Sequence, residues 1–347
     1  MKTEVLNERN HTLNYIKALA CFCVLMLHCG FPGIIGKFIY GPSRFAVPFF
    51  FMVSGYYVYS QNTSKVLSKL PRKIKHIAVL LVGAECTYLI WHIIQSAIEG
   101  RVKGVYDWFT NTFTVEKGVR FIIFQTTPVG DVSWFLVALI LCYIVTYPIA
   151  KYNLWNLTIR MIPVLLLINI IFGEVAPFWG INVQWYWCSN FWLLGFPFYA
   201  MGYWVRRKQN ELCVNCSVKS TALAVILSII LITIERVFTS ANQFFIGNIF
   251  LALSLFLFSI RYPSVFKEKY FVENIGEKYS VYIYILHPVV RDILYGLILE
   301  YLDLTSCIIM IWGKPIFVFV ACIGISIVID TLGSKHKILA NKIESKS

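Results

Sequence analysis

Two ionisable residues stand at the ends of an otherwise uncharged stretch near the N-terminus of the chain. Lys17 and His28 bound the segment KALACFCVLMLH, with ten uncharged residues between them. On a helix, eleven positions make three turns plus about 20°, so both side chains share one face, about 16 Å apart along the axis. A histidine on such a face is a candidate general base, and a lysine is a candidate phosphate ligand. The structural alternative is a lysine that extends to the membrane surface and a hydrogen-bonded histidine.

A second polar face is predicted close to the C-terminus. Four side chains recur at intervals of four, three and four residues in KYSVYIYILHPVVRDIL: Ser280, Tyr284, His287 and Arg291. This spacing places all four on one side of a helix. Pro288 leaves a backbone carbonyl one turn back without its usual donor and favours a kink. We expect function from His287 and Arg291, whereas the other two fit equally well as a polar seam between helices.

Single polar residues in other apolar segments are further candidates. Glu85 lies near the middle of LLVGAECTYLIWH and could pair with a buried cation or relay a proton. Arg44 is the second residue of SRFAVPFFFMVSGYYVY, in which Ser54 and Gly55 permit close approach of another helix. Trp134 opens WFLVALILCY. Each of these signals is weak when taken alone.

The elements that must hold these residues are apolar helices. The chain has 347 residues, of which 58% are hydrophobic and 14% charged, and its mean hydropathy is +0.67. A water-soluble protein of this size could not bury so much apolar surface, so we expect an all-α, multi-pass membrane protein. Ten segments are long enough to cross, or nearly cross, a bilayer core about 30 Å thick: 13–31, 45–60, 77–98, 132–150, 156–172, 189–205, 218–234, 243–260, 279–299 and 315–332.

The distribution of basic residues indicates how these helices are oriented. If the N-terminus is cytoplasmic, twenty-one lysines and arginines fall in inner segments and eight in outer segments. This bias is typical of membrane proteins and supports an even number of spans, with both termini in the cytoplasm. The formal net charge of +13 then reflects topology and attraction to anionic membrane lipid, which argues against a nucleic-acid partner.

The remaining features predict one membrane domain without a metal. Most cysteines lie in apolar runs as small hydrophobic residues. Cys213 and Cys216 form a single C-x2-C, which is at best half of a zinc site. We expect one domain over residues 1–347, with a cytoplasmic segment at 1–12 and a basic cytoplasmic tail at 333–347. Stretches of the loop at 99–131 are expected to lie on the membrane surface or to dip into it.

Together these segments resemble the integral-membrane acyltransferase-3 family, whose members mostly O-acylate carbohydrates. The first-span signature of the family is an arginine, ten residues and a histidine; Lys17 and His28 match it with lysine in place of arginine. VPFFFMVSGYY, preceded by Arg44, is similar to the family's P-x-FF-x-x-SG run.

Further motifs extend the resemblance in order from about residue 12 to residue 330. Arg72-Lys73-Ile74-Lys75 is similar to the family's R-x-x-R element, with lysine second. WFL at 134–136, LGFPFYAMGYWVRR and KYSVYIYILHP complete the pattern. Val132 and Ser133 stand where the family often has histidine and leucine, and the family's frequent esterase-like domain is not expected here.

The resemblance implies a reaction and roles for the candidate residues. The donor would be cytoplasmic acyl-CoA, most often acetyl-CoA, as a co-substrate without a bound cofactor. The acceptor would be a hydroxyl of a surface polysaccharide or a lipid-linked glycan. His28 would be the base or a transient acyl carrier. The candidate catalytic residues are His28, Lys17 and Glu85. The candidate acyl-CoA ligands are the cations Lys17, Arg72, Lys75, Arg206 and Arg207. The candidates for an acceptor site or channel are Arg44, Ser54, Trp134, Ser280, Tyr284, His287 and Arg291.

Two other functions remain open at this stage. A transporter or flippase of a small or lipid-linked substrate could use the same membrane module, and Glu85 with nearby histidines would suit proton coupling. A catalytically silent scaffold in surface-polymer assembly is the third possibility. All three predict a multi-pass protein of the cytoplasmic membrane. The acceptor, the acyl group (acetyl or succinyl) and the oligomeric state stay open.

Overall fold

The computed structural model describes residues 9–98, 102–213, 216–239, 243–266 and 271–344. Within these ranges the secondary structure is helical and no strand is present. Six helices or helical runs are long and apolar enough to cross a membrane: Thr63–Ile98, Trp134–Lys151, Trp155–Phe178, Val218–Phe238, Phe271–Tyr301 and Ile308–Gly333. The chain is therefore an all-α, multi-pass membrane protein, as its composition predicts.

Each of the ten predicted segments coincides with one helix or one unbroken helical run. Those outside the six spans are α1 (His11–His28), α3 (Ala46–Val58), the run of η3 (Phe191–Gly195) and α11 (Phe196–Arg207), and α14 (Ile246–Arg261). With 13 and 16 residues, α3 and α14 are shorter than the roughly 20 residues that a bilayer span requires. The count of ten spans and the cytoplasmic termini therefore stay predictions.

The chain forms two compact units. The terminal unit combines Met1–Tyr40 with Pro263–Ser347, and the central unit is Gly41–Tyr262. The terminal unit thus joins the two ends of the chain and holds both of the predicted polar faces. A single functional domain over the whole chain remains a prediction.

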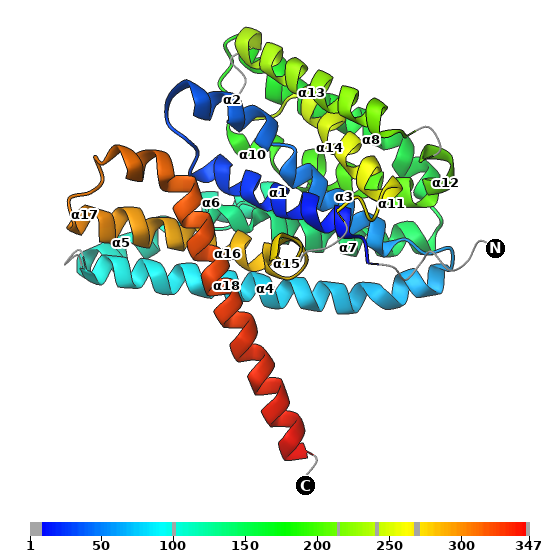
Figure 1. The fold of residues 1–347 in the computed structure, drawn as a ribbon. Helices are drawn as coiled ribbons and strands as arrows, with labels where there is room; N and C mark the ends of the chain where they lie inside the picture. The colour runs from blue at the N-terminus through cyan, green and yellow to red at the C-terminus, as the bar shows by residue number, and fades with distance from the viewer. Residues whose placement is uncertain (1–8, 99–101, 214–215, 240–242, 267–270, 345–347) are drawn as a thin grey trace. The chain divides into compact units, whose positions relative to one another are not determined.

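In the terminal unit, α1 packs against the segment that carries the second polar face. That segment comprises α15 (Phe271–Asn274), the π-helical turn η4 (Ile275–Tyr279) and α16 (Ser280–Ile293), and it continues through η5 (Leu294–Ile298) to α17 (Leu299–Tyr301) (Figure 1). A Cβ atom on Gly276 would lie 1.8 Å from the backbone oxygen of Asn14, so only glycine permits this contact. Phe22 of α1 also packs against Phe319, with ring centroids 5.0 Å apart.

The last helix of the terminal unit, α18 (Ile308–Glu344), is longer than its apolar part. The segment predicted at 315–332 lies within it, and the backbone stays helical through most of the predicted basic tail. The short α2 (Gly33–Ser43) follows α1 and runs from the terminal unit into the first residues of the central unit.

The central unit is built around a close contact between α3 and α11. A Cβ atom on Gly55 would lie 1.9 Å from the backbone oxygen of Tyr199, and one on Gly202 would lie 2.0 Å from that of Met52. The close approach predicted at Ser54 and Gly55 is therefore confirmed. The surrounding helices are α4 (Thr63–Ile98), α7 (Trp134–Lys151), α8 (Trp155–Ile170), α13 (Val218–Thr239) and α14.

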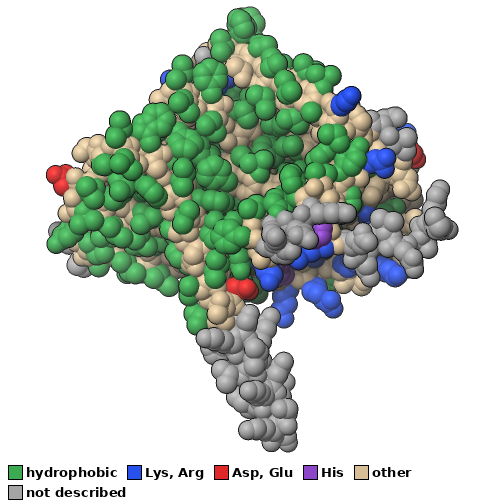
Figure 2. Space-filling model, viewed as in Figure 1, with side chains coloured by type: hydrophobic (Ala, Val, Ile, Leu, Met, Phe, Trp, Pro, Cys, Tyr) green, Lys and Arg blue, Asp and Glu red, His purple; other side chains and the backbone are tan. Residues whose placement is uncertain are grey.

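The predicted surface stretches form two further helices, α5 (Val102–Thr112) and α6 (Val115–Phe124). On α6 no residue is buried, and Val115 is 86% exposed. Apolar side chains also cover much of the visible face in Figure 2, with few charged side chains among them. Such a surface is expected where a protein contacts lipid rather than water.

The cysteines carry free thiols, including Cys213 and Cys216 of the C-x2-C loop. Cys213 is buried, and burial raises the pKa of its thiol, which opposes the thiolate form that binds zinc. Among the described residues, no group of three or more His, Cys, Asp or Glu side chains could hold a metal ion.

Candidate functional site

The predicted site residues fall into both units. The terminal unit holds Lys17, His28, Ser280, Tyr284, His287 and Arg291. The central unit holds Arg44, Ser54, Arg72, Lys75, Glu85, Trp134, Arg206 and Arg207.

The two histidines predicted from separate segments lie beside one another in the terminal unit. His28 is the last residue of α1 and His287 lies in α16; their ring centroids are 5.0 Å apart, with the ring planes at 42°. The side chain of His28 is exposed, whereas His287 is only 1% exposed. The fold thus pairs an accessible imidazole with a buried one.

The buried histidine has a defined protonation pattern. Nδ1 of His287 lies 2.8 Å from the backbone oxygen of Tyr284. A carbonyl oxygen can only accept a hydrogen bond, so Nδ1 carries the proton of the neutral ring. Nε2 is then an acceptor, and it is buried without a hydrogen-bond partner among the described residues.

The other residues of this face make internal contacts. Ser280 Oγ donates to the backbone oxygen of Gly276 at 3.1 Å. Cys21 of α1 donates through Sγ to the backbone oxygen of Ser280 at 3.6 Å. The hydroxyl of Ser280 therefore bonds within its own helical run, and its contact with α1 is made by its backbone oxygen. Arg291 forms an ion pair with its neighbour Asp292, with Nη2 and Oδ1 2.7 Å apart, so its charge is partly neutralised.

Lys17 lies half-buried on α1, and the carboxylate of Glu277 of η4 attracts its positive charge. Glu277 also forms an ion pair with Arg9. This carboxylate was not predicted as a site residue because it stands just outside an apolar run. The cation proposed for CoA phosphate therefore already has an acidic neighbour.

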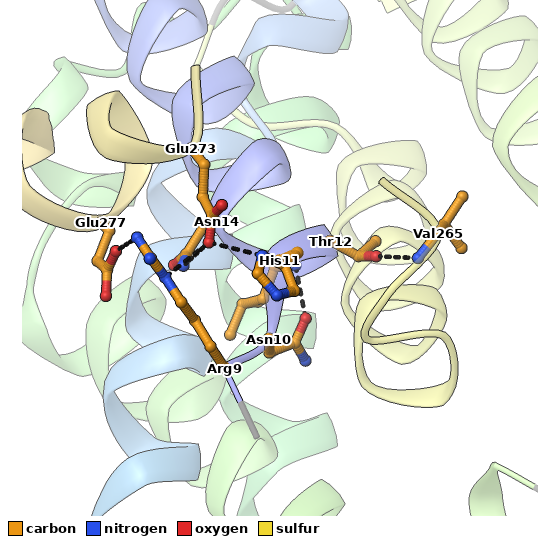
Figure 3. A network of polar contacts seen from close by, with 9 residues as sticks. Arg9, Asn10, His11, Thr12, Asn14, Val265, Glu273 and Glu277 are labelled. Atoms are coloured by element: carbon orange, nitrogen blue, oxygen red, sulfur yellow. Dashed lines mark hydrogen bonds and ion pairs between the residues drawn. The ribbon is translucent and has the colours of Figure 1, made fainter. Parts of the chain in front are cut away.

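A second carboxylate, Glu273 of α15, anchors the start of α1 (Figure 3). Its Oε1 lies 2.7 Å from Nε of Arg9, 2.9 Å from Nδ1 of His11 and 3.3 Å from Nδ2 of Asn14. Glu273 and Glu277 are four residues apart, so both face the N-terminal end of α1. The sequence carried a signal for this contact: two glutamates four residues apart, and three polar residues, Arg9, His11 and Asn14, around the start of another helix.

In the central unit, the two adjacent arginines at the end of α11 differ in their surroundings. Arg206 lies over the ring of Tyr56, with Cζ 4.7 Å from the centroid, and donates to the hydroxyl of Tyr56 and to Oε1 of Gln209. Arg207 is exposed and donates to Oδ1 of Asn156 at 3.1 Å. Arg206 therefore joins α3 to α11, while Arg207 stays accessible.

The basic element at the start of α4 divides in the same way. Arg72 and Lys75 are exposed, whereas Lys73 is half-buried with Nζ 5.7 Å from the ring centroid of Tyr143. Tyr143 in turn forms a side-chain hydrogen bond with Ser54. Lys73 was not among the predicted ligands, and it lies off the helix face that residues 72 and 75 share.

The remaining candidates lie at separate places in the central unit. Arg44 donates to the backbone oxygen and to Oε1 of Gln243, just before α14 begins. Trp134 is buried against Phe51, with ring centroids 6.2 Å apart. Glu85 is half-buried in α4, where its charge acts on Tyr88, one turn along the same helix.

A family model described as Acyltransferase domain (acyltransferase 3) matches residues 10–331. The chain belongs to the acyltransferase-3 family. The match contains every predicted site residue, from Lys17 to Arg291, and it confirms the resemblance seen in the ordered motifs. No curated protein and no solved structure matches the chain. Family membership and the apolar helices together identify a membrane acyltransferase.

Proposed function

We propose that the protein is an O-acyltransferase of the cytoplasmic membrane that moves an acetyl group from cytoplasmic acetyl-CoA to a hydroxyl of a surface or lipid-linked glycan. The family match supports acyl transfer, and the apolar helices support a membrane-embedded reaction. The observation that carries the proposal is the contact of the exposed His28 with the buried His287. Transfer to a hydroxyl requires a base, and an accessible imidazole in contact with a second, buried imidazole meets that need.

In this proposal, His28 takes the proton of the acceptor hydroxyl. The hydroxyl oxygen then forms a bond to the carbonyl carbon of the thioester, and the bond from that carbon to sulfur breaks. CoA leaves as a thiolate and receives the proton that His28 holds, so the histidine returns to its neutral form. An acyl group carried briefly on His28 would give the same products in two steps.

The exposed cations of α4 are the first choice for holding the donor. Arg72 and Lys75 share one helix face and are open to solvent, which suits the diphosphate and the 3′-phosphate of CoA. The exposed Arg207 is also available, whereas Arg206 is committed to Tyr56. With the predicted orientation, both cationic segments face the cytoplasm, where acyl-CoA is found.

An assay with radiolabelled acetyl-CoA tests the proposal. The labelled donor is incubated with the purified protein and with glycan-bearing membranes from cells that lack the gene. We expect release of CoA together with an acetyl label on the glycan, and loss of both in His28→Ala. The matched control is His92→Ala, because His92 stacks on Trp108 of α5 and has no proposed role in transfer. Turnover at the wild-type rate in His28→Ala would refute the assignment of the base. Substrate movement without CoA release would favour a transporter.

A further inference from the structure

The buried nitrogen of His287 is a hydrogen-bond acceptor in need of a donor. Its Nε2 atom has no partner among the described residues, and the side chain is 1% exposed. Buried polar atoms are nearly always paired, so an exception in a native fold calls for an explanation. Here the explanation lies in the sequence around the histidine and in the residue that faces it.

The backbone of α16 fixes the tautomer of His287. In a regular helix, the carbonyl of Tyr284 would accept from the backbone nitrogen of residue 288, but that residue is Pro288 and carries no N–H. The carbonyl is thus left for Nδ1 of His287, which lies 2.8 Å from it. The order Tyr-x-x-His-Pro therefore places the proton on Nδ1 and the lone pair on Nε2.

The residue that faces this histidine is His28. The ring centroids are 5.0 Å apart. Each ring nitrogen lies about 1 Å from its ring centre, so two nitrogens that face one another would be about 3 Å apart, which is hydrogen-bond distance. His28 ends α1 with an exposed side chain, beside the buried ring of His287. A neutral histidine also has an N–H to donate.

We infer that His287 is a positioning residue that orients His28 and fixes its tautomer for the acyl transfer proposed above. The carbonyl of Tyr284 holds the proton on Nδ1 of His287, and Nε2 of His287 accepts the N–H of His28. The outer nitrogen of His28 is then left unprotonated and faces the acceptor hydroxyl. The arrangement parallels the aspartate that orients the histidine of serine hydrolases, with a neutral imidazole as the orienting group.

The inference rests on His28 as the base, but it assigns a separate task to each ring. The hydroxyl proton goes to the outer nitrogen of His28 and leaves later with CoA. The inner N–H stays on His28 throughout, and Nε2 of His287 stabilises the imidazolium that forms between these steps. His287 itself neither gains nor loses a proton.

Two variants of similar polarity test the inference. Glutamine at 287 can place an oxygen near the position of Nε2, whereas asparagine places its amide near Nδ1 and leaves the Nε2 position empty. We expect His287→Asn to lower kcat about 100-fold, the lower end of the contribution of a positioned base, with the KM for acetyl-CoA unchanged. His287→Gln should restore at least a tenth of wild-type kcat. Equal loss in both variants, or a shared rise in KM, would overturn the inference.

Nuclear magnetic resonance of ¹⁵N-histidine-labelled full-length protein in nanodiscs supplies a readout that needs no turnover. The chain has six histidines, and the signal of His28 is assigned from its absence in His28→Ala. We expect a single neutral tautomer for His28 in the wild type and in His287→Gln, and a mixture of both tautomers in His287→Asn. A mixture in the wild type, or an unchanged signal in His287→Asn, would overturn the inference even if His28 is the base. Whether His28 is the base is tested separately, because wild-type activity in His28→Ala would refute that assignment.

Discussion

Removing the carboxylate of Glu277 should strengthen the binding of acetyl-CoA if Lys17 is a donor ligand. Lys17 is attracted to Glu277, and Arg9 forms an ion pair with the same carboxylate. An incoming phosphate must compete with Glu277 for both cations. Glu277→Gln keeps the shape of the side chain and removes its charge, so we expect a lower KM for acetyl-CoA.

The size of the fall in KM follows from the solvent exposure of the ion pair between Arg9 and Glu277. The side chain of Glu277 is 37% exposed and that of Arg9 46%, so solvent screens their interaction. Ion pairs of this kind contribute roughly 0.2–1 kcal/mol. Because 1.4 kcal/mol corresponds to a factor of ten, the KM should fall by at most about fivefold. The difference should shrink at high salt, since ions screen the same charges.

Initial rates at varied acetyl-CoA concentration, in low and high salt, measure this effect. The matched control is Glu211→Gln, because Glu211 pairs with the exposed Lys208 in the central unit, with Nζ and Oε1 2.7 Å apart. Lys17→Ala should raise the KM, and Lys17→Arg should be tolerated. An unchanged KM in both Glu277→Gln and Lys17→Ala would refute the reasoning and leave Lys17 as a structural partner of Glu277.

Two other changes test the central unit. Gly55→Ala should lower the free energy of unfolding by about 1–3 kcal/mol, since a Cβ there would lie 1.9 Å from a backbone oxygen of α11. Thermal unfolding measures this loss of stability. The control is Gly83→Ala, where the added Cβ meets nothing within 4 Å. Replacing Arg72 and Lys75 together by glutamine should raise the KM for acetyl-CoA about tenfold with little loss of stability. Lys73→Gln should instead affect stability more than the KM, because Lys73 packs on a tyrosine ring. The opposite ranking would reject the assignment of donor ligands.

The sequence located the apolar helices but not where they end. The predicted segment 77–98 is the apolar part of α4, which begins at Thr63. The extra turns carry lysine and arginine, which are good helix formers but lower the hydropathy. The same applies to α18, whose helix continues to Glu344. Hydropathy reports where a helix meets lipid, whereas backbone hydrogen bonds decide its length.

The candidate site was predictable within each helix and unpredictable between helices. Periodicity placed His287 with Tyr284 on one face, and the structure retains that relation, with the ring centroids 6.1 Å apart. The contact of His28 with His287 joins opposite ends of the chain, and spacing along the sequence carries no information on such a contact. Glu273 and Glu277 were missed for a different reason: they precede an apolar run, where charged residues are read as part of a loop.

The carboxylate of Glu277 also gives a physical meaning to the lysine that stands where the family has arginine. A guanidinium can hold a carboxylate through two parallel hydrogen bonds, and such a pair is hard to exchange for another anion. The ammonium of Lys17 is a compact charge that makes a single, less directional contact. Because Glu277 already contacts Arg9, its attraction to Lys17 can be given up for a phosphate at small cost. If Lys17 is a donor ligand, as we propose, the substitution preserves a cation that can exchange the carboxylate for a phosphate.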